Sequence, residues 1–174
     1  MSDSPRILVI TGHGKGKTTS AMGMALRASG HGMGVVIIQF VKQADTGEME
    51  AMKKLDNINF TQTGLGFLPK ATSEAFDVHK AAAVKGLAMA KEAIASDRCD
   101  MLVLDEICFA ISAGLLSEYE VIEVIGKARP DQRIILTGRD ASENIIGIAD
   151  TVSIIACVKH GFEAGIEAQK GVEF

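Results

Sequence analysis

The sequence predicts one three-layer α/β domain built on a mostly parallel sheet of about six strands. Strand-like apolar runs alternate with helix-like runs along the chain, which is the pattern of repeated strand, helix and strand units. Two of these runs, 35–41 and 101–104, are almost continuously apolar, as expected for parallel strands buried on both faces. The 174 residues are 47% hydrophobic, which suffices for one core, and no linker or internal repeat interrupts them. We therefore expect a single domain over residues 1–174.

The first strand is expected at 7–10, and a glycine-rich segment follows it at 11–19 with the sequence TGHGKGKTT. A phosphate-binding loop belongs between a strand and a helix, because its glycines let backbone N–H groups converge on an anion. Lys17 would reach the terminal phosphates, and the hydroxyl of Thr18 would meet a magnesium ion on the phosphate chain. The match is irregular, since the usual pattern has a glycine where this chain has Thr11. A chance cluster of glycine and lysine is the alternative.

Helices and strands alternate after this loop. The run 18–29 is rich in Ala, Met and Leu and favours a helix, which the glycines of 30–32 end. The β-branched run 35–41 favours a strand, the charged run 47–55 a short helix, and the alternating run 58–62 a shorter strand. Lys42 follows the second strand at the edge where ligands bind to open parallel sheets, so it either faces a ligand or is a solvated strand end.

The segment 63–69 contains two glycines and a proline and is therefore expected to be a loop. It also carries apolar side chains, Leu65, Phe67 and Leu68, which a fully solvated loop would avoid. Two interpretations stay open. The segment is either a lid that contacts substrate or a loop that packs back onto the core.

The second half of the chain continues the alternation. The alanine-rich run 73–96 has strong helix propensity, and a capping-box pattern begins another helix over 117–128. An apolar strand is expected at 133–137, a helix at 142–149 and a last strand at 151–158. The remaining tail has regularly spaced glycines and ends in alternating polar and apolar residues, which is not the pattern of a disordered terminus.

Paired carboxylates, Asp105 and Glu106, end the fourth expected strand. Magnesium needs oxygen ligands opposite a phosphate loop, so these acids and Thr18 are candidate metal ligands. The alternative is a strand that ends in two solvated acids. Arg139 follows the fifth strand at the same edge, where it either holds a phosphate or carboxylate or pairs with Asp140.

Composition excludes several classes of function. The net charge is −4 and aromatic residues make up 5%, with no Trp, which argues against an extended nucleic-acid surface. The apolar runs are too short to cross a membrane, and the polar start lacks the features of a signal peptide, so we expect a cytoplasmic protein. The three cysteines are widely spaced and are expected to be buried, reduced thiols: Cys99, Cys108 and Cys157.

Taken together, the motifs resemble those of the P-loop corrinoid adenosyltransferases, also called ATP:cob(I)alamin or cob(I)yrinic acid a,c-diamide adenosyltransferases. The resemblance covers nearly the whole chain and includes a threonine at the position of Thr11. It implies a P-loop NTPase-like (RecA-like) domain. The segments that carry it are 11–19, Gln39-Phe40-Val41-Lys42, Leu104-Asp105-Glu106, Leu136-Thr137-Gly138-Arg139, Val158-Lys159-His160, Ala164-Gly165, Ala168-Gln169 and Gly171.

The resemblance implies transfer of the 5′-deoxyadenosyl group of ATP to the Co(I) centre of a reduced corrinoid, with release of triphosphate, in adenosylcobalamin synthesis or salvage. Reduced cobalt is a strong nucleophile, so the protein would align the reactants and stabilise the leaving group without a general base. The resemblance further implies Mg2+ or Mn2+ as a cofactor, a flavoprotein as the reductant and a homodimer.

The resemblance also assigns roles to individual residues. Lys15, Lys17 and Glu106 would be catalytic, and Thr18, Glu106 and Asp105 would lie at the metal. Phe67 matches an aromatic residue at the corrinoid, whereas Pro69 replaces the tryptophan that usually follows two positions later. The residues expected to bind the nucleotide or the corrinoid are Gly12, His13, Gly14, Lys15, Gly16, Lys17, Thr18, Thr19, Arg27, Phe67 and Arg139.

Longer members of the family carry an N-terminal helical extension over the corrinoid, whereas this chain begins almost at its first strand, so we expect its site to close differently. Two other functions remain open. An ordinary P-loop ATPase or kinase would position a water or an acceptor hydroxyl and release ADP. A binding module would hold the nucleotide or the corrinoid without turnover.

Overall fold

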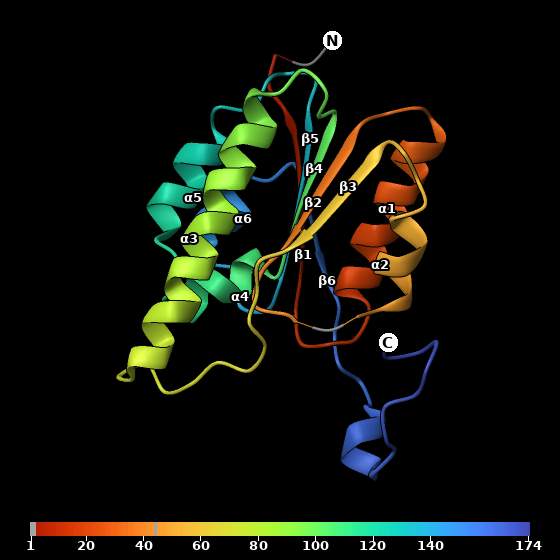
Figure 1. Ribbon diagram of the computed structural model, residues 1–174, viewed down its shortest axis with the longest axis vertical. Coiled ribbons are helices and arrows are strands. Elements are labelled where there is room, and N and C mark those ends of the chain that lie inside the picture. Colours follow the sequence, from red (N-terminus) through yellow and green to blue (C-terminus); the bar gives the residue numbers. More distant parts are fainter. Residues whose placement is uncertain (1–2, 44) are drawn as a thin grey trace.

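Six parallel strands form one open sheet in the order β3-β2-β4-β5-β1-β6 (Figure 1). The structure is a computed structural model, and it describes residues 3–43 and 45–174. The prediction of an α/β fold with a mostly parallel sheet of about six strands is confirmed, and every strand pair is parallel. The strands are β1 (Arg6–Thr11), β2 (Val35–Gln39), β3 (Ile58–Gln62), β4 (Met101–Asp105), β5 (Arg133–Thr137) and β6 (Thr151–Ile154).

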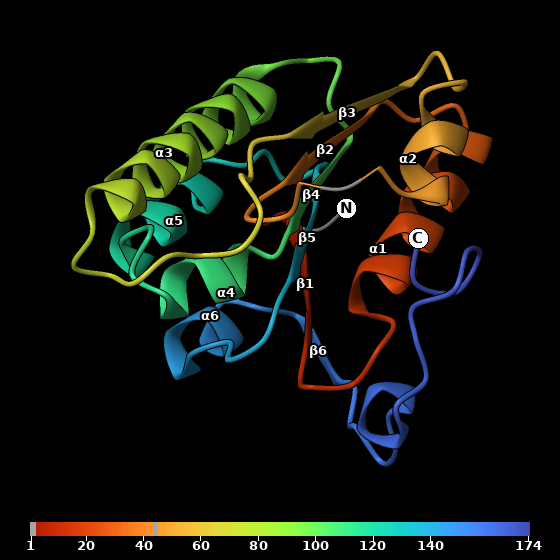
Figure 2. The same ribbon diagram turned by 60° about the horizontal axis from the view of Figure 1, so that its bottom comes forward.

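Helices cover both faces of the sheet and give the expected three layers (Figure 1, Figure 2). On one face lie α1 (Lys17–Gly30) and α2 (Gly47–Met52). On the other lie α3 (Glu74–Ala95), α4 (Ile107–Ser112), α5 (Glu118–Ile125) and α6 (Glu143–Gly147). A short 3-10 helix, η1 (Gly161–Ala164), lies in the C-terminal tail, which we define as residues 159–174.

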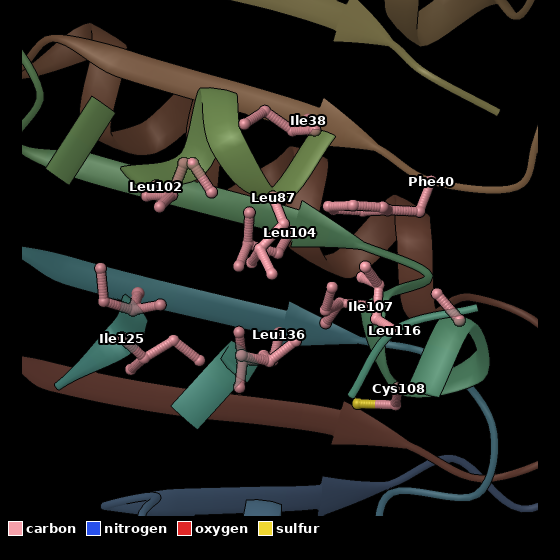
Figure 3. Close-up of a cluster of buried hydrophobic side chains, with 14 of the residues drawn as sticks. Ile38, Phe40, Leu87, Leu102, Leu104, Ile107, Cys108, Leu116, Ile125 and Leu136 are labelled. Atoms are coloured by element: carbon pink, nitrogen blue, oxygen red, sulfur yellow. The ribbon is translucent and has the colours of Figure 1, made fainter. Parts of the chain in front are cut away.

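Two apolar clusters fill the spaces between the layers. The cluster under α3 to α6 includes Leu87 of α3, Leu104 of β4 and Leu136 of β5 (Figure 3). The cluster under α1 and α2 includes Met22 of α1 and Val103 of β4. Neighbouring residues of β4 thus point into different clusters, which is why the sequence of this strand is apolar at every position before Asp105.

The register of the sheet gathers polar side chains at one edge. Gln39 is paired with Asp105 between β2 and β4, and Ile10 with Thr137 between β1 and β5. The last residues of four parallel strands therefore end next to the loop that follows β1. Ligands of open parallel sheets bind at this edge.

Some element boundaries differ from those predicted. The strand β2 ends at Gln39, and Val41 adopts a φ of 63°, so the chain turns before Lys42. The helix α4 begins directly after Glu106, which has a φ of 64°, and its six residues are too few for a visible helical period. The capping box expected at the start of α5 is wrong, because Ser117 makes no side-chain cap.

The last strand is four residues long instead of the eight expected, because the chain leaves β6 to contact the loop after β1. The amide of Ile155 donates to the carbonyl oxygen of Thr11 at 2.8 Å.

The burial of the three thiols is predicted in part. Cys99 and Cys108 are buried as expected, whereas Cys157 lies beyond β6 and is exposed, so its expected burial is wrong. Burial raises the pKa of Cys99 to about 11 and that of Cys108 to about 12.

Over the described residues, no helix combines the length and the apolar character needed to cross a membrane.

Candidate active site

The segment 12–16 forms a tight loop between β1 and α1. Gly12 and Gly16 have φ angles of 97° and 115°, a region that favours glycine, and Gly16 directly precedes α1. Lys17 is the first residue of α1 and only 8% of its surface is exposed. Its Nζ donates a hydrogen bond to the carbonyl oxygen of Gly14 at 2.9 Å. A lysine and a helix N-terminus therefore face one space, as phosphate binding requires.

Several charges act on Lys17. Burial lowers its pKa, and the negative charge of Glu106 opposes this effect. The positive charges of Arg139 and Lys42 lower the pKa further. The site thus holds three cations that repel one another, and a bound triphosphate would relieve this repulsion.

Gly14 is held by the chain that follows β6. Its amide donates to the carbonyl oxygen of Ile155 at 2.7 Å. A Cβ atom at position 14 would lie 2.5 Å from the carbonyl oxygen of Ala156, closer than atoms can approach without a shift of the backbone. Glycine at this position therefore serves close packing, and one amide of the loop is already occupied.

Asp105 is the centre of a buried hydrogen-bond network at the ends of the strands. Its side chain is fully buried, which rules out a solvated acid at this position. The hydroxyls of Thr18 and Thr137 donate to Oδ1 at 2.9 and 2.5 Å, and the side-chain amide of Gln39 donates to Oδ2 at 2.7 Å. One carboxylate thus connects α1, β2, β4 and β5.

Lys42 lies between this network and Glu106. Its Nζ is 2.7 Å from Thr18 Oγ1, 2.9 Å from Glu106 Oε1 and 3.6 Å from Asp105 Oδ2. Burial alone would lower the pKa of Lys42, but the two carboxylates outweigh it and the pKa is raised. Lys42 is therefore a charged ammonium with ordered protein contacts at the cavity, which is not a purely solvated strand end, and its contact with a ligand stays a prediction.

Two cavities meet at this edge of the sheet. The smaller, of about 340 Å³, is lined by the loop residues 13–19. The larger, of about 630 Å³, is lined by four apolar side chains, among them Phe67 and Phe109, and by four polar or charged ones. Among the described residues, three line both cavities: Lys42, Glu106 and Arg139.

The segment 63–69 packs back onto the core, which is one of the two interpretations considered for it, and its contact with substrate stays a prediction. Gly66 donates its amide to the carbonyl oxygen of Val41 at 2.8 Å, and Leu68 packs against the core. Phe67 is fully exposed, at 103%, and lines the larger cavity. The loop is thus fixed to the body of the protein while it presents one aromatic ring to the cavity.

The tail forms the outer rim of the smaller cavity. His160, Val172 and Glu173 line it together with the loop. Lys15 Nζ lies 3.5 Å from Glu173 Oε1, so a lysine of the phosphate loop is paired with an acid near the end of the described chain. His13 lies 3.3 Å from Asp140, which therefore pairs across the rim with the loop.

Most predicted site residues come together. Asp105 lies behind Thr18, and Phe67 lies in the larger cavity. Gly12 and Arg27 are not among the residues that line either cavity, and Arg27 lies in the last turn of α1, so its contact with the nucleotide stays a prediction. The predicted residues that line the smaller cavity are His13, Gly14, Lys15, Gly16, Lys17, Thr18, Thr19, Glu106 and Arg139.

Sequence reasoning did not assign Thr137, Phe109, His160 or Glu173 to the site. The position of Thr137 was predictable, because this residue ends an apolar strand at the same edge of the sheet as Asp105. Phe109 sits in the short helix that was not predicted, and the two tail residues reach the loop only through folding of the tail. No local sequence pattern predicts these contacts of α4 and of the tail with the cavities.

A strand, a glycine-rich loop and a helix, opposite a strand that ends in buried aspartate, define a P-loop NTPase-like fold. The family model of the ATP:corrinoid adenosyltransferases BtuR, CobO and CobP matches residues 3–174. The chain belongs to this family.

Known relatives agree with this assignment. A corrinoid adenosyltransferase of Sinorhizobium sp. is 41% identical over 172 residues, which are 97% of this chain and 79% of the relative. A corrinoid adenosyltransferase of Pseudomonas aeruginosa is 41% identical over 97% of this chain and 83% of the relative. The corrinoid adenosyltransferase CobA of Salmonella typhimurium is 36% identical over 97% of this chain and 85% of the relative.

Proposed function

We propose that this protein transfers the 5′-deoxyadenosyl group of ATP to the Co(I) centre of a reduced corrinoid and releases inorganic triphosphate. One observation carries the proposal: a polar cavity with a phosphate loop opens beside a larger apolar cavity, and the two share Lys42, Glu106 and Arg139. The smaller cavity suits the triphosphate, and the larger one suits an extended macrocycle. Membership in the family supports the same reaction.

The reaction needs alignment and charge stabilisation more than acid–base catalysis. Reduced cobalt supplies the electron pair for the new bond to C5′, so no side chain has to activate a nucleophile. Lys17 and Lys15 would balance the charge of the departing triphosphate together with the free amides of the loop.

The oxygen atoms at the edge of the sheet fit a magnesium ion bound with ATP. Magnesium is commonly held by one or two carboxylates together with phosphate oxygens and water. Over the described residues, no three His, Cys, Asp or Glu side chains group as a metal site by themselves. We assign the direct contacts to Thr18 and Glu106, with Asp105 holding the Thr18 hydroxyl. When bound, Mg2+ or Mn2+ would neutralise phosphate charge.

We place the corrinoid in the larger cavity against Phe67. The exposure of this ring supports the placement, since a fully exposed aromatic side chain at the cavity is available to cover an apolar ring system. A Phe67→Ala variant should therefore lose affinity for the corrinoid and retain its affinity for ATP. Loss of nucleotide binding alone would contradict the placement.

The proposal includes three further elements. The cobalt of the corrinoid must be reduced to Co(I) before it can react. A flavoprotein is the proposed reductant. A homodimer and a cytoplasmic location are proposed from the resemblance of the sequence to the family.

The decisive experiment follows the products. Under anaerobic conditions with ATP and a chemically reduced corrinoid, the visible spectrum should report a cobalt–carbon bond and one triphosphate should be released for each bond formed. Because the reaction leaves the β–γ linkage intact, the β,γ-imido analogue of ATP should also support transfer. An ATPase or kinase would instead release ADP and reject this analogue. Tight binding of both ligands without a cobalt–carbon bond would identify a binding module.

A further inference from the structure

The positions of the two cavities determine the direction in which the triphosphate runs. In the proposed reaction, C5′ of ATP is attacked from the corrinoid side, so it has to lie where the cavities meet, beside Lys42, Glu106 and Arg139. The α-phosphate is bonded to the C5′ oxygen and therefore lies next to this boundary. The β- and γ-phosphates then extend away from the boundary along the smaller cavity.

The C-terminal tail borders this other part of the smaller cavity. In the part of the chain that the structure describes, His160, Val172 and Glu173 line the smaller cavity and do not line the larger one. The tail reaches the loop before α1 through the pair of Lys15 and Glu173, and it lies away from α4, which carries Phe109 of the larger cavity (Figure 1, Figure 2). A γ-phosphate that points away from the boundary therefore approaches the tail.

His160 is a tail residue with a hydrogen-bond donor suited to a phosphate. Its ring nitrogen Nδ1 accepts a hydrogen bond from the backbone amide of Phe162 at 3.2 Å, at the start of η1. A neutral imidazole has one donor and one acceptor nitrogen, so this bond places the proton on Nε2. The Nε2–H group is then available to an acceptor in the cavity that this side chain lines.

The neighbours of His160 are less suited to this task. Val172 is apolar, and Glu173 is an acid that repels phosphate. Lys15 attracts phosphate, but its Nζ lies 3.5 Å from Glu173 Oε1, so part of its charge is offset. The hydrogen bond that fixes the His160 ring joins it to the backbone of η1 and to none of the residues assigned to the metal, so metal and ATP do not remove it on binding.

We infer that His160 donates a hydrogen bond from Nε2 to the γ-phosphate and thereby makes the site prefer a nucleoside triphosphate to a diphosphate. This inference rests on the proposed function. The γ-phosphate is remote from the C5′–O bond that breaks, so its contact with His160 is the same before and during transfer. His160 therefore contributes to the affinity for ATP and not to the rate of bond formation.

The test uses a His160→Asn variant. Oδ1 of asparagine can accept the Phe162 amide as Nδ1 does, so this variant keeps the cap of η1 and loses the Nε2–H donor. Calorimetry measures the affinity of both proteins for ATP and for ADP, each with magnesium, and the wild type should prefer ATP. The variant should bind ATP about tenfold more weakly and ADP within about twofold of the wild type, as expected for one lost hydrogen bond to a charged group.

His31→Asn is the matched control, because His31 is exposed and lies at the opposite end of α1 from the loop. This control should keep both affinities. In a single turnover with reduced corrinoid and saturating ATP, His160→Asn should form the cobalt–carbon bond at a rate within about threefold of the wild type.

Four results would overturn the inference. The first is a wild type without a preference for ATP, and the second is an unchanged affinity of His160→Asn for ATP. The third is an equal loss of affinity for ATP and ADP, which would mean that His160 only shapes the tail. The fourth is a slowed bond-forming rate at saturating ATP, since His160 would then act at the reacting atoms.

A His160→Gln variant provides the test if His160→Asn does not fold. Glutamine carries an N–H donor near the position of Nε2 and lacks the ring nitrogen that caps η1. It should keep the preference for ATP over ADP, and loss of this preference would contradict the inference.

The wild-type protein separates this inference from the proposed function. A wild type that binds ATP and reduced corrinoid but forms no cobalt–carbon bond refutes the proposed function itself. A wild type that transfers the adenosyl group, together with a His160→Asn variant that keeps its preference for ATP, refutes only the role of His160.

Discussion

The inner wall and the outer rim of the smaller cavity are held together in different ways. We call the network of Thr18, Gln39, Asp105 and Thr137 the inner wall: Thr18 and Gln39 line the cavity, Asp105 and Thr137 are buried behind them, and hydrogen bonds of 2.5 to 2.9 Å converge on the Asp105 carboxylate. The outer rim consists of His13, Lys15, Asp140 and Glu173, which form one ion pair, Lys15–Glu173 at 3.5 Å, and one contact between the His13 imidazole and the Asp140 carboxylate at 3.3 Å, all between exposed or partly exposed side chains.

This difference indicates which part of the site is ready before substrate binds. Buried, fully bonded polar groups are costly to rearrange, so the inner wall keeps its geometry in the free protein. Exposed ion pairs contribute little and exchange easily with water or with another anion. We therefore expect substrate to find a preformed inner wall and to replace the contacts of the rim.

Removal of the Asp105 carboxylate should have the largest effect on stability. An Asp105→Ala variant leaves several buried donors without an acceptor, and its free energy of unfolding should fall by about 3 kcal/mol or more. A His13→Ala variant at the rim should lose less than about 1 kcal/mol. Urea denaturation of both variants measures the contrast. Equal losses would show that the rim is as firmly built as the inner wall.

The two lysines of the loop should also differ in their contribution to ATP binding, with a larger contribution from Lys17 than from Lys15. Lys17 is nearly buried at the start of α1, and charged hydrogen bonds of this kind contribute about 1.5–3 kcal/mol, so Lys17→Ala should weaken ATP binding by about 100-fold. Lys15 is more exposed and already paired, so Lys15→Ala should cost about tenfold or less. Calorimetry with ATP measures both. A larger loss for Lys15 would place the main phosphate contact at the rim.

The inner wall was largely predictable because its signals are local. Asp105 ends an apolar strand, Thr18 follows a glycine loop, and parallel strands bring their carboxyl ends to one edge whatever the details of packing. The same reasoning placed Lys42 at this edge without deciding whether it faced a ligand. The distances to Thr18 and Glu106 show that Lys42 is ordered at this edge, and its contact with a ligand stays a prediction.

The rim was not predictable, because its contacts join distant parts of the chain without a periodic pattern. Lys15 meets Glu173 only because the chain leaves β6 early and folds back past the loop. The turns of the tail, such as the bond from the Glu173 amide to the Gln169 carbonyl, involve few residues and bury little apolar surface. The regular glycines predicted order in the tail but not the direction in which it folds.

The junction between loop and tail can be tested at Gly14. A Gly14→Ala variant places a methyl group 2.5 Å from the Ala156 carbonyl oxygen, and the resulting strain should cost about 2 kcal/mol of stability. Gly23 in α1 is a matched control, since a Cβ atom there meets nothing within 4 Å, and Gly23→Ala should stabilise the protein by about 0.5–1 kcal/mol. Thermal unfolding compares the two. If Gly14→Ala left the stability unchanged, residues 155–156 would move away readily, and the contact between Gly14 and these residues would be as easily rearranged as those of the rim.

The smallest effect is expected at the rim itself, in a Glu173→Gln variant. Hydrogen bonding from the Gln169 amide, together with the charge of Lys15, lowers the pKa of Glu173, so this acid is ionised at neutral pH and competes with phosphate for Lys15. Glutamine keeps an acceptor for the amide and removes the charge. ATP should therefore bind about two- to fivefold more tightly, within the range expected for an exposed ion pair.

Salt distinguishes this competition from a direct contact between Glu173 and the nucleotide. Salt screens exposed charges, so the gain in affinity should shrink at high ionic strength, where Lys15 is already shielded from Glu173. Glu167→Gln, another exposed acid of the tail, should leave affinity unchanged at both salt concentrations. If Glu173→Gln instead weakened ATP binding, this acid would be part of the nucleotide site, and its contacts would tighten when substrate binds. The rim would then complete the cavity around the bound substrate, and the contacts of Glu173 would be kept instead of being replaced.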